Sequence, residues 1–396
     1  MSSREAEGPA PKLVLIGGGH AHLHVLLSLA TERWPPLDVT LLAPEPTQLY
    51  TGMVPGYLYG RYRLEELAID LEALCGAAGA VFRQERANVV DGDARLVETA
   101  EGPIPFEVAS LDVGSVPRGA DLPGVRDHAA SLRPLAAVVD LRDRLDRLAG
   151  THEGRSVRVV VVGGGAGGIE VCLAVNRRLE QRGARGELVI VDGSDAILPG
   201  FPARARQKAG RAVTGVGGRW RLGSDVLEVE PRVVQLASGE QIACDLPIWV
   251  TGAAPHCLLS KSSLPLSPDG FFEVDQTLRS SDGSPVWGAG DCVDLQARRL
   301  PKAGVFAVRQ GPVLAYNLRA ALSGHQPRPY HPQTNFLSLL DTADGRAILR
   351  RGSLVLHNRL AMRIKERIDR RFVRRLQRIG SSAEGLRHPT PPRDDP

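Results

Sequence analysis

The sequence predicts an α/β protein with two Rossmann-like domains and a C-terminal amphipathic helix. Two glycine-rich loops, which begin at Gly17 and Gly163, each follow a short apolar run of strand length. Each loop opens a stretch with helical spacing of apolar residues, and a second apolar run follows. The chain has 396 residues, of which 43% are hydrophobic and 24% charged, and this length and composition suit two or three globular domains.

Cysteine content and the N-terminal segment indicate where the chain works. The five cysteines are widely spaced, and no CxxC or CxxxxC pair occurs. We therefore expect neither a disulfide scaffold nor a structural zinc site, and we predict a reducing, cytoplasmic compartment. Residues 1–11 lack the basic and apolar parts of a signal peptide, and no run approaches 18 apolar residues.

The first glycine-rich loop, residues 17–22, lies between predicted strands at 12–16 and 38–42. Its glycines allow a pyrophosphate to approach the backbone, and the following helix N-terminus favours the negative charge. The loop departs from the usual pattern because a histidine occupies the third glycine position and the expected acid is displaced beyond the second strand. The alternative is a tight turn without a ligand. The residues predicted to contact a dinucleotide are Gly17, Gly19, His20, His22 and Glu45.

The second loop has glycine at all three required positions, Gly163, Gly165 and Gly168. The next predicted strand, 187–191, ends in Asp192, close to where a ribose 2′-hydroxyl should be held. A carboxylate there would repel a 2′-phosphate, so we favour NADH over NADPH. A purely structural turn is the alternative. Two such units in one chain suggest one site for FAD and one for the nicotinamide that reduces it, because a flavin accepts a hydride and passes electrons on singly or in pairs.

Three later segments carry further motifs: LDVGSVP at 111–117, DLPIWVTGAAP at 245–255 and VWGAGDC at 286–292. In this order they resemble motifs of the pyridine-nucleotide-disulfide oxidoreductase superfamily, and the resemblance extends from Lys12 to about Arg346. It implies that the aspartate of the last motif binds the ribityl chain of FAD. The cofactor-binding residues implied by these segments are Gly114, Ser115, Gly252, Gly290 and Asp291.

A narrower resemblance is to type II NADH dehydrogenases, and to the related flavoproteins that are fused to selenide, water dikinase. It rests on residues 17–23, 50–56 and 301–312, and it adds Thr51 to the cofactor-binding residues. No kinase domain is expected in this chain. The stretch at 50–56 lacks the CxxxxC of the disulfide reductases. Electrons are therefore expected to pass directly to a small acceptor.

The order of the motifs predicts a nicotinamide domain inserted in a FAD domain. We expect FAD-binding pieces at 11–122 and 258–346, with the NAD(P)H-binding domain at 123–257 between them. A basic amphipathic region at 347–380 and a disordered tail at 381–396 would follow.

Three residues are predicted to act at the redox centre. Glu170 lies at the start of the NAD helix, and the family resemblance implies that it positions NADH; the alternative is an ordinary first-turn glutamate. Pro301 suits a first helical position, and this helix start would place Lys302 where reduced flavin carries negative charge. A solvated lysine is the alternative. Gln310 matches the glutamine of the quinone-side motif in type II NADH dehydrogenases, and this resemblance implies a place in the acceptor pocket.

Histidines in the first loop raise the question of a metal. His20 and His24 share a helical face, but His22 does not and nothing nearby supplies further ligands. We predict no metal site. Contact with the FAD phosphates or the flavin is the preferred role.

Positive charge is concentrated near the C-terminus, where nine Lys or Arg and two acids occur between Leu354 and Gly380. Apolar residues recur there at helical spacing from Leu356 to Ile379, although Lys365 and Arg371 break the pattern. Such a helix can lie in a membrane interface, and type II dehydrogenases reach membrane quinone through elements of this kind. The alternative is a helix packed on the FAD domain with a solvated basic face. Nucleic acid binding is not predicted, because no aromatic stacking platform accompanies the charge.

These observations predict a FAD-dependent NADH:acceptor oxidoreductase, with quinone as the preferred acceptor and a cytoplasmic location that includes peripheral attachment to the inner face of the cell membrane. The first alternative is a soluble flavin reductase that acts on a sulfur or selenium species or another small molecule. The second is a redox-sensing binding protein with negligible turnover. A homodimer stays open.

Overall fold

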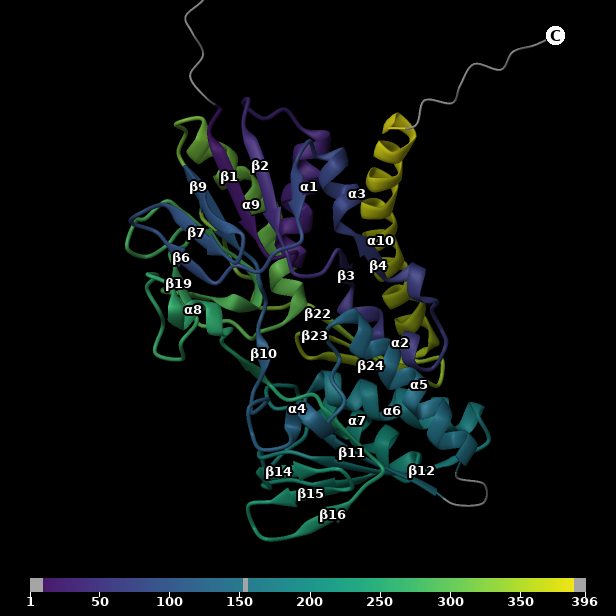
Figure 1. The fold of residues 1–396 in the computed structure, drawn as a ribbon. Helices are drawn as coiled ribbons and strands as arrows, with labels where there is room; N and C mark the ends of the chain where they lie inside the picture. The colour runs from purple at the N-terminus through teal and green to yellow at the C-terminus, as the bar shows by residue number, and fades with distance from the viewer. Residues whose placement is uncertain (1–9, 152–155, 388–396) are drawn as a thin grey trace, which may run out of the picture.

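The computed structural model describes residues 10–151 and 156–387, which form two α/β lobes and a C-terminal sheet and helix (Figure 1). The upper lobe in Figure 1 contains the first glycine-rich loop and the late motif at 286–292, which are far apart in the sequence. The lower lobe contains the second glycine-rich loop. The C-terminal sheet lies between the lobes, and the C-terminal helix runs along the side of the upper one.

A five-stranded parallel sheet forms the centre of the upper lobe, in the order β20-β9-β1-β2-β5. Its central strands are apolar and largely inaccessible to solvent, and Leu13 and Leu15 are fully buried. The strands are β1 (Lys12–Ile16), β2 (Asp38–Leu42), β5 (Val81–Arg83), β9 (Val108–Leu111) and β20 (Val286–Gly288). The covering helices are α1 (His20–Thr31), α3 (Leu71–Ala77) and α9 (Gly304–Leu322).

Smaller elements complete the upper lobe. They are β3 (Thr47–Leu49), η1 (Thr51–Met53), α2 (Val54–Leu58), η2 (Leu64–Glu66), β4 (Ala68–Asp70), β6 (Val89–Asp91), β7 (Leu96–Thr99), β8 (Gly102–Pro105), α8 (Cys257–Lys261), β19 (Phe272–Val274), η3 (Gly290–Cys292) and β21 (Val293–Leu295).

The lower lobe has a four-stranded parallel sheet in the order β13-β12-β11-β17 and an antiparallel sheet of β14, β15 and β16. The chain crosses between the lobes twice, where β10 (Val116–Pro117) and β18 (Ala253–Ala254) pair. The strands are β11 (Ser156–Val162), β12 (Arg185–Val191), β13 (Arg219–Arg221), β14 (Val226–Glu230), β15 (Val233–Leu236), β16 (Gln241–Ala243) and β17 (Leu246–Trp249). The helices are α4 (Val125–His128), α5 (Leu135–Thr151), α6 (Ala166–Gln181) and α7 (Ala203–Gly215).

The C-terminal region differs from the prediction in two ways. Strands β22 (Leu337–Asp341), β23 (Ala347–Arg351) and β24 (Leu354–Asn358) form an antiparallel sheet, so Leu356 belongs to a strand and not to the helix. Helix α10 (Arg359–Arg387) then continues beyond residue 380, so the prediction of disorder was wrong for residues 381–387. The remainder of the predicted tail, residues 388–396, lies outside the described residues.

Helix α10 packs chiefly against α3 of the upper lobe and β23 of the C-terminal sheet, and it buries Ala361, Met362, Val373 and Leu376. Across the part of the chain that the structure describes, no helix is both long and apolar enough to cross a bilayer.

Candidate active site

The second glycine-rich loop forms an open cradle before helix α6. Gly163 has a φ of +122°, and a Cβ there would lie 2.2 Å from the Val250 carbonyl oxygen. A Cβ on Gly168 would lie 1.8 Å from the Gly163 carbonyl oxygen, so both positions require glycine. At Gly165, by contrast, no atom lies within 4 Å of the Cβ position. This open space in front of a helix N-terminus fits a pyrophosphate.

Asp192 lies beside this cradle, at the carboxyl end of β12. Its Oδ2 accepts a hydrogen bond from the Gly164 N–H at 2.5 Å, and its Oδ1 accepts one from the Ser194 N–H at 2.7 Å. Each carboxylate oxygen keeps a further lone pair. The side chain is therefore held at the strand end where a ribose hydroxyl would be bound.

The His22 ring supports the first glycine-rich loop through contacts of both its nitrogens. This side chain is fully buried, with Nδ1 2.6 Å from the Gly17 carbonyl oxygen and Nε2 2.8 Å from the Ser110 hydroxyl. Burial lowers the pKa of His22 to about 4, so the ring is neutral at physiological pH. The prediction that this side chain contacts FAD was wrong, since the ring supports the loop instead.

His20 and Glu45 lie differently. The His20 ring packs edge-on against Tyr50 and near Phe372, with centroid distances of 5.4 and 6.0 Å. Burial, and then the charge of Arg133, lower the pKa of His20 to about 4. Glu45 is exposed beyond the carboxyl end of β2. Among the described residues, no group of three or more His, Cys, Asp or Glu side chains could hold a metal ion.

Asp112 is a site residue that the sequence analysis did not single out. Its Oδ2 accepts hydrogen bonds from the N–H groups of Ala21 at 2.7 Å and His22 at 3.1 Å, at the N-terminus of α1. The Asp112 carboxyl therefore occupies two N–H groups at the start of this helix, the end that favours a nucleotide phosphate in such loops. The signal was an acid directly after the apolar strand 108–111, within a motif already compared with the family.

The segment VWGAGDC at 286–292 is fixed by a hydrogen bond to Gln310. Gly290 has a φ of +76°, and its N–H donates to Gln310 Oε1 at 2.7 Å. Gln310 is only 2% exposed, so it supports the turn that presents Asp291 and does not line an open acceptor pocket. Burial raises the pKa of Asp291, and the charges of Arg133 and Lys302 oppose this rise.

Lys302 does not lie at a helix start. Helix α9 begins at Gly304, so the placement of Pro301 in the first turn was wrong. The Lys302 ammonium donates to the Val293 carbonyl at 2.5 Å and to Asp294 Oδ1 at 2.8 Å, and it lies 3.7 Å from the centre of the Phe271 ring. The lysine is therefore a half-buried ion-pair partner of Asp294 and not a solvated side chain.

The remaining predicted residues lie in the two segments that cross between the lobes, 111–117 and 245–255, which we call the linking segments, and in η1. Gly114 has a φ of +69°, and the Ser115 carbonyl accepts a hydrogen bond from Arg133 at 3.4 Å. The Gly252 carbonyl accepts one from the Arg118 N–H at 2.7 Å, next to the β10–β18 pair. Thr51 begins the η1 turn in the upper lobe.

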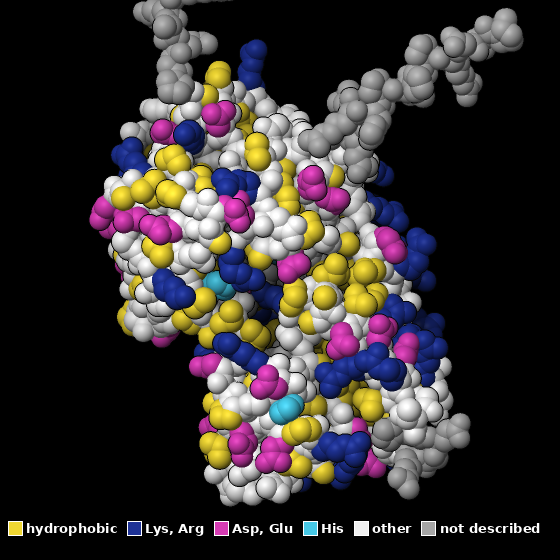
Figure 2. All heavy atoms as spheres, in the orientation of Figure 1, with side chains coloured by type: hydrophobic (Ala, Val, Ile, Leu, Met, Phe, Trp, Pro, Cys, Tyr) yellow, Lys and Arg dark blue, Asp and Glu magenta, His cyan; other side chains and the backbone are white. Residues whose placement is uncertain are grey.

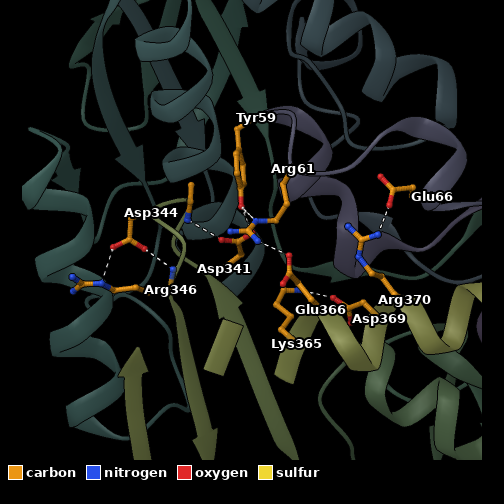
Figure 3. A network of polar contacts seen from close by, with 11 residues as sticks. Tyr59, Arg61, Glu66, Asp341, Asp344, Arg346, Lys365, Glu366, Asp369 and Arg370 are labelled. Carbon is orange, nitrogen blue, oxygen red and sulfur yellow. Dashed lines mark hydrogen bonds and ion pairs between the residues drawn. The ribbon is translucent and has the colours of Figure 1, made fainter. Parts of the chain in front are cut away.

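Three buried charged residues, Asp341, Lys365 and Asp369, lie where the C-terminal sheet meets helix α10 (Figure 3). Together with the half-buried Glu170 of α6, we call them the buried ion cluster. The Lys365 ammonium donates to Asp369 Oδ2 at 2.8 Å and to the Gly52 carbonyl at 2.7 Å. The Glu170 carboxylate accepts from the Asp341 N–H at 2.7 Å. The cluster therefore connects the NAD helix, the C-terminal sheet and the η1 turn.

Two tyrosines extend this cluster toward the upper lobe. The Tyr59 hydroxyl donates to Asp341 Oδ2 at 2.7 Å, and the Tyr50 hydroxyl donates to Asp369 Oδ1 at 3.2 Å. Arg61 donates in turn to Tyr59 at 2.6 Å (Figure 3). Burial, and then the neighbouring carboxyls, raise the pKa of Tyr50 and Tyr59, so both phenols stay protonated and act as hydrogen-bond donors to Asp369 and Asp341.

Burial sets the protonation of the buried ion cluster. It raises the pKa of Glu170 to about 7, while the Lys365 charge opposes the rise. Burial likewise raises the pKa of Asp341 and Asp369. The pKa of Lys365 is raised because the charges of Asp369 and Glu170 outweigh its own burial. Glu170 therefore titrates in the physiological range.

The sequence indicated only part of the buried ion cluster. Glu170 was predicted from its place in the second loop, whereas Asp341 and Asp369 were not. The available signal was Lys365, a charge that interrupts the apolar stripe of the C-terminal helix.

Comparison with known proteins gives a family and a fold. A family model described as pyridine nucleotide-disulphide oxidoreductase matches residues 11–311. A demethylphylloquinone reductase from Synechocystis sp. is 24% identical over 345 residues, which cover 83% of this chain and 84% of that protein. A probable NADH dehydrogenase from Dictyostelium discoideum is also 24% identical, over 83% of this chain and 78% of that protein.

Solved structures show the same fold. The sulfide:quinone oxidoreductase of Aquifex aeolicus superimposes with a TM-score of 0.79 at 16% identity, covering 93% of this chain and 92% of that one. NDH2 from Plasmodium falciparum in complex with NADH gives 0.78 at 14% identity, covering 97% and 99%.

Proposed function

Because the chain belongs to the pyridine nucleotide-disulphide oxidoreductase family, we propose that it oxidises NADH through bound FAD and passes the electrons to a quinone. It is a FAD- and NAD(P)H-dependent enzyme. Relatives named as a demethylphylloquinone reductase and an NADH dehydrogenase support this choice of acceptor and donor. The acid at Asp192 supports NADH over NADPH.

The buried ion cluster is the observation that carries this proposal. Glu170, from the helix that follows the second cradle, contacts the C-terminal sheet, and Lys365, whose charge acts on Glu170, binds the η1 turn. A centre where donor, flavin and acceptor meet needs all three parts of the chain at one place.

The chain's own residues perform binding and proton handling. Gly163, Gly165 and Gly168 leave room for the NADH pyrophosphate, and Asp192 binds its ribose. Residues of the first loop, the linking segments and η3 hold FAD, which when bound supplies the two-electron chemistry. Glu170 and its carboxyl neighbours hold the proton that reduction of a quinone requires.

Anaerobic stopped-flow mixing tests this function. The purified yellow protein is mixed first with NADH and then with a short-chain quinone, while flavin absorbance is followed. We expect fast bleaching and then fast recovery. Recovery only with a sulfur, selenium or other small acceptor would favour a soluble flavin reductase. A long-lived charge-transfer band without turnover would favour a redox sensor, and no bleaching would refute the nicotinamide assignment.

Helix α10 and the adjacent strand offer a surface for peripheral membrane attachment. Of seven large hydrophobic side chains that are exposed in the described chain, four lie here: Leu354, Leu356, Leu360 and Ile368. Basic side chains follow the same helix along the right edge of Figure 2. Six arginines between residues 367 and 378 line a groove of about 590 Å³. An apolar strip beside dense positive charge fits the interface of an anionic bilayer.

Two interpretations of this helix came from its sequence, a membrane-interface helix and a helix packed on the protein, and they apply to different faces. Val373 and Leu376 pack on the upper lobe, whereas Leu360 and Ile368 point outward at 61% and 44% exposure. Peripheral attachment at the inner face of the cell membrane, with quinone as the acceptor, is the location that we propose.

Removing two exposed arginines should weaken binding to anionic vesicles. Because each basic residue near such a surface contributes about 1 kcal/mol, Arg363→Gln/Arg367→Gln should lower the partition coefficient about 30-fold. Vesicle co-sedimentation at low salt measures this. Arg204→Gln/Arg211→Gln, two exposed arginines on α7, is the matched control and should bind as the unchanged protein does. Equal loss in both pairs would remove α10 as the attachment surface.

A further inference from the structure

We infer that the Asp112 carboxyl takes up a proton from solvent when the FAD diphosphate occupies the first glycine-rich loop, so that FAD is released faster as the pH rises. This inference rests on the proposed binding of FAD at that loop. It assigns to Asp112 a role in holding the cofactor that is separate from electron transfer.

The Asp112 side chain is wedged between two glycine-rich turns. It is 3% exposed, and its Oδ2 accepts the N–H groups of Ala21 and His22. A Cβ on Gly19 would lie 2.2 to 2.4 Å from the carboxyl atoms, and a Cβ on Gly290 would lie 2.4 Å from Oδ1. Only glycine at these two positions leaves room for the carboxyl at the helix N-terminus.

The second lobe provides an internal comparison, because Val250 is the structural counterpart of Asp112. The Asp112 N–H donates to Ile16 at the end of β1, and the Val250 N–H donates to Val162 at the end of β11, both at 2.8 Å. The carbonyl of each residue also lies 2.2 to 2.4 Å from the Cβ position of the first loop glycine, Gly163 or Gly17. One chain therefore contains the same loop twice, with Val250 beside it in the lower lobe and Asp112 beside it in the upper lobe.

The acid in place of a valine changes the electrostatics of the first loop. The Cβ position of Gly165 faces open space, whereas that of the equivalent Gly19 meets the Asp112 carboxyl. An ionised carboxylate would stand directly beside the position of a diphosphate, and like charges at such distances disfavour the ionised state. The chain can relieve this repulsion by protonating Asp112, whose Oδ1 is then able to donate a hydrogen bond.

The surroundings of Asp112 favour such protonation. Burial, and then the charge of Asp291 on η3, raise the pKa of Asp112 to about 7, against the two N–H groups of α1. Of the other titratable groups packed here, His22 is neutral and the Cys292 thiol is buried with its pKa raised. The charges of Arg133 and Lys302 act on Asp291. Added phosphate charge would raise the pKa of Asp112 further.

The sign of the effect follows from linkage. A group whose pKa is higher in the complex than in the free protein takes up a proton on binding. The affinity is therefore complete below the free-protein pKa, about 7, and falls as the pH rises toward the pKa in the complex. One proton changes the affinity by at most about tenfold per pH unit.

The test follows FAD release from the holoenzyme between about pH 6 and pH 9. After dilution, the rise in free-FAD fluorescence gives the release rate, which we expect to increase up to about tenfold per pH unit above pH 7. Asp112→Asn, which keeps an oxygen acceptor for the N–H groups, should release FAD at a rate that does not vary with pH. Asp112→Ser is a second variant without a titrating group. Asp38→Asn, an exposed acid at the start of β2, is the matched control and should retain the original profile.

A second readout follows the carboxyl itself. The infrared spectrum of the oxidised holoenzyme should contain the C=O stretch of a protonated carboxyl, which Asp112→Asn removes and Asp38→Asn retains. A release rate of the unchanged protein that is independent of pH, or an unchanged pH profile in both Asp112 variants, would overturn the inference. A protein that is purified without any flavin would instead refute the proposed function.

Discussion

Gly165→Val is expected to abolish reduction of the flavin by NADH while FAD remains bound and the fold remains intact. No protein atom lies within 4 Å of the Cβ position, so the valine methyls would occupy only the space proposed for the pyrophosphate. The backbone at Gly165, with φ of −72° and ψ of −176°, is extended and suits a branched residue. Since even small displacements of a bound reactant cost about 10²-fold in rate, we expect a loss of at least that size.

The measurement is the rate of flavin bleaching by NADH in the stopped-flow instrument, alongside the visible spectrum of bound FAD. Gly215→Val, at an equally open glycine at the end of α7, is the matched control and should bleach normally. Gly168→Val should fail to fold, because its Cβ would lie 1.8 Å from the Gly163 carbonyl oxygen. Undiminished bleaching of the Gly165 variant would mean that NADH binds elsewhere.

Lys365→Met is expected to destabilise the protein by about 3 to 5 kcal/mol, the usual cost of removing one partner from a buried ion pair. The Lys365 and Asp369 side chains are only 6% and 7% exposed, and their ammonium and carboxylate lie 2.8 Å apart. Glu170 would also lose the positive charge that opposes the rise of its pKa. Urea unfolding followed by far-ultraviolet circular dichroism gives the free energy of unfolding.

Arg363→Met is the control for this experiment, because it removes a positive charge from an exposed position on the same helix. It should change stability by less than about 0.5 kcal/mol. The double variant Lys365→Met/Asp369→Leu should be more stable than Lys365→Met alone, since no charge is left unpaired in that pair. A Lys365 variant as stable as the control would show that the buried ion cluster does not hold α10 in place.

Local sequence patterns were sufficient for the two nucleotide-binding lobes. Strand, glycine-rich loop and helix are consecutive in the chain, so the geometry at Gly163 and Gly168 follows from short-range sterics that the sequence displays directly. The fold class and the family resemblance are confirmed by the family match to residues 11–311 and by the structural neighbours.

Long-range packing decided what the sequence could not predict. His22 looked like a ligand to FAD, but its ring binds Ser110 on β9, which is 88 residues away in sequence. Gln310 likewise contacts Gly290, and this contact depends on how α9 packs against η3. The buried ion cluster combines residues from three distant segments, so only Glu170 could be assigned before the structure was known.

The order of strands in the upper lobe has a consequence for synthesis on the ribosome. Strand β9 ends at Leu111, but its neighbour β20 begins only at Val286, after the whole lower lobe has been translated. During that interval the fully buried residues of β9 lie at an open sheet edge, where a neighbouring nascent chain could pair. The lower-lobe sheet, by contrast, draws all its strands from Ser156 to Trp249 and can close first. Slowed elongation between these two points would therefore lengthen the period in which the newborn chain needs a chaperone.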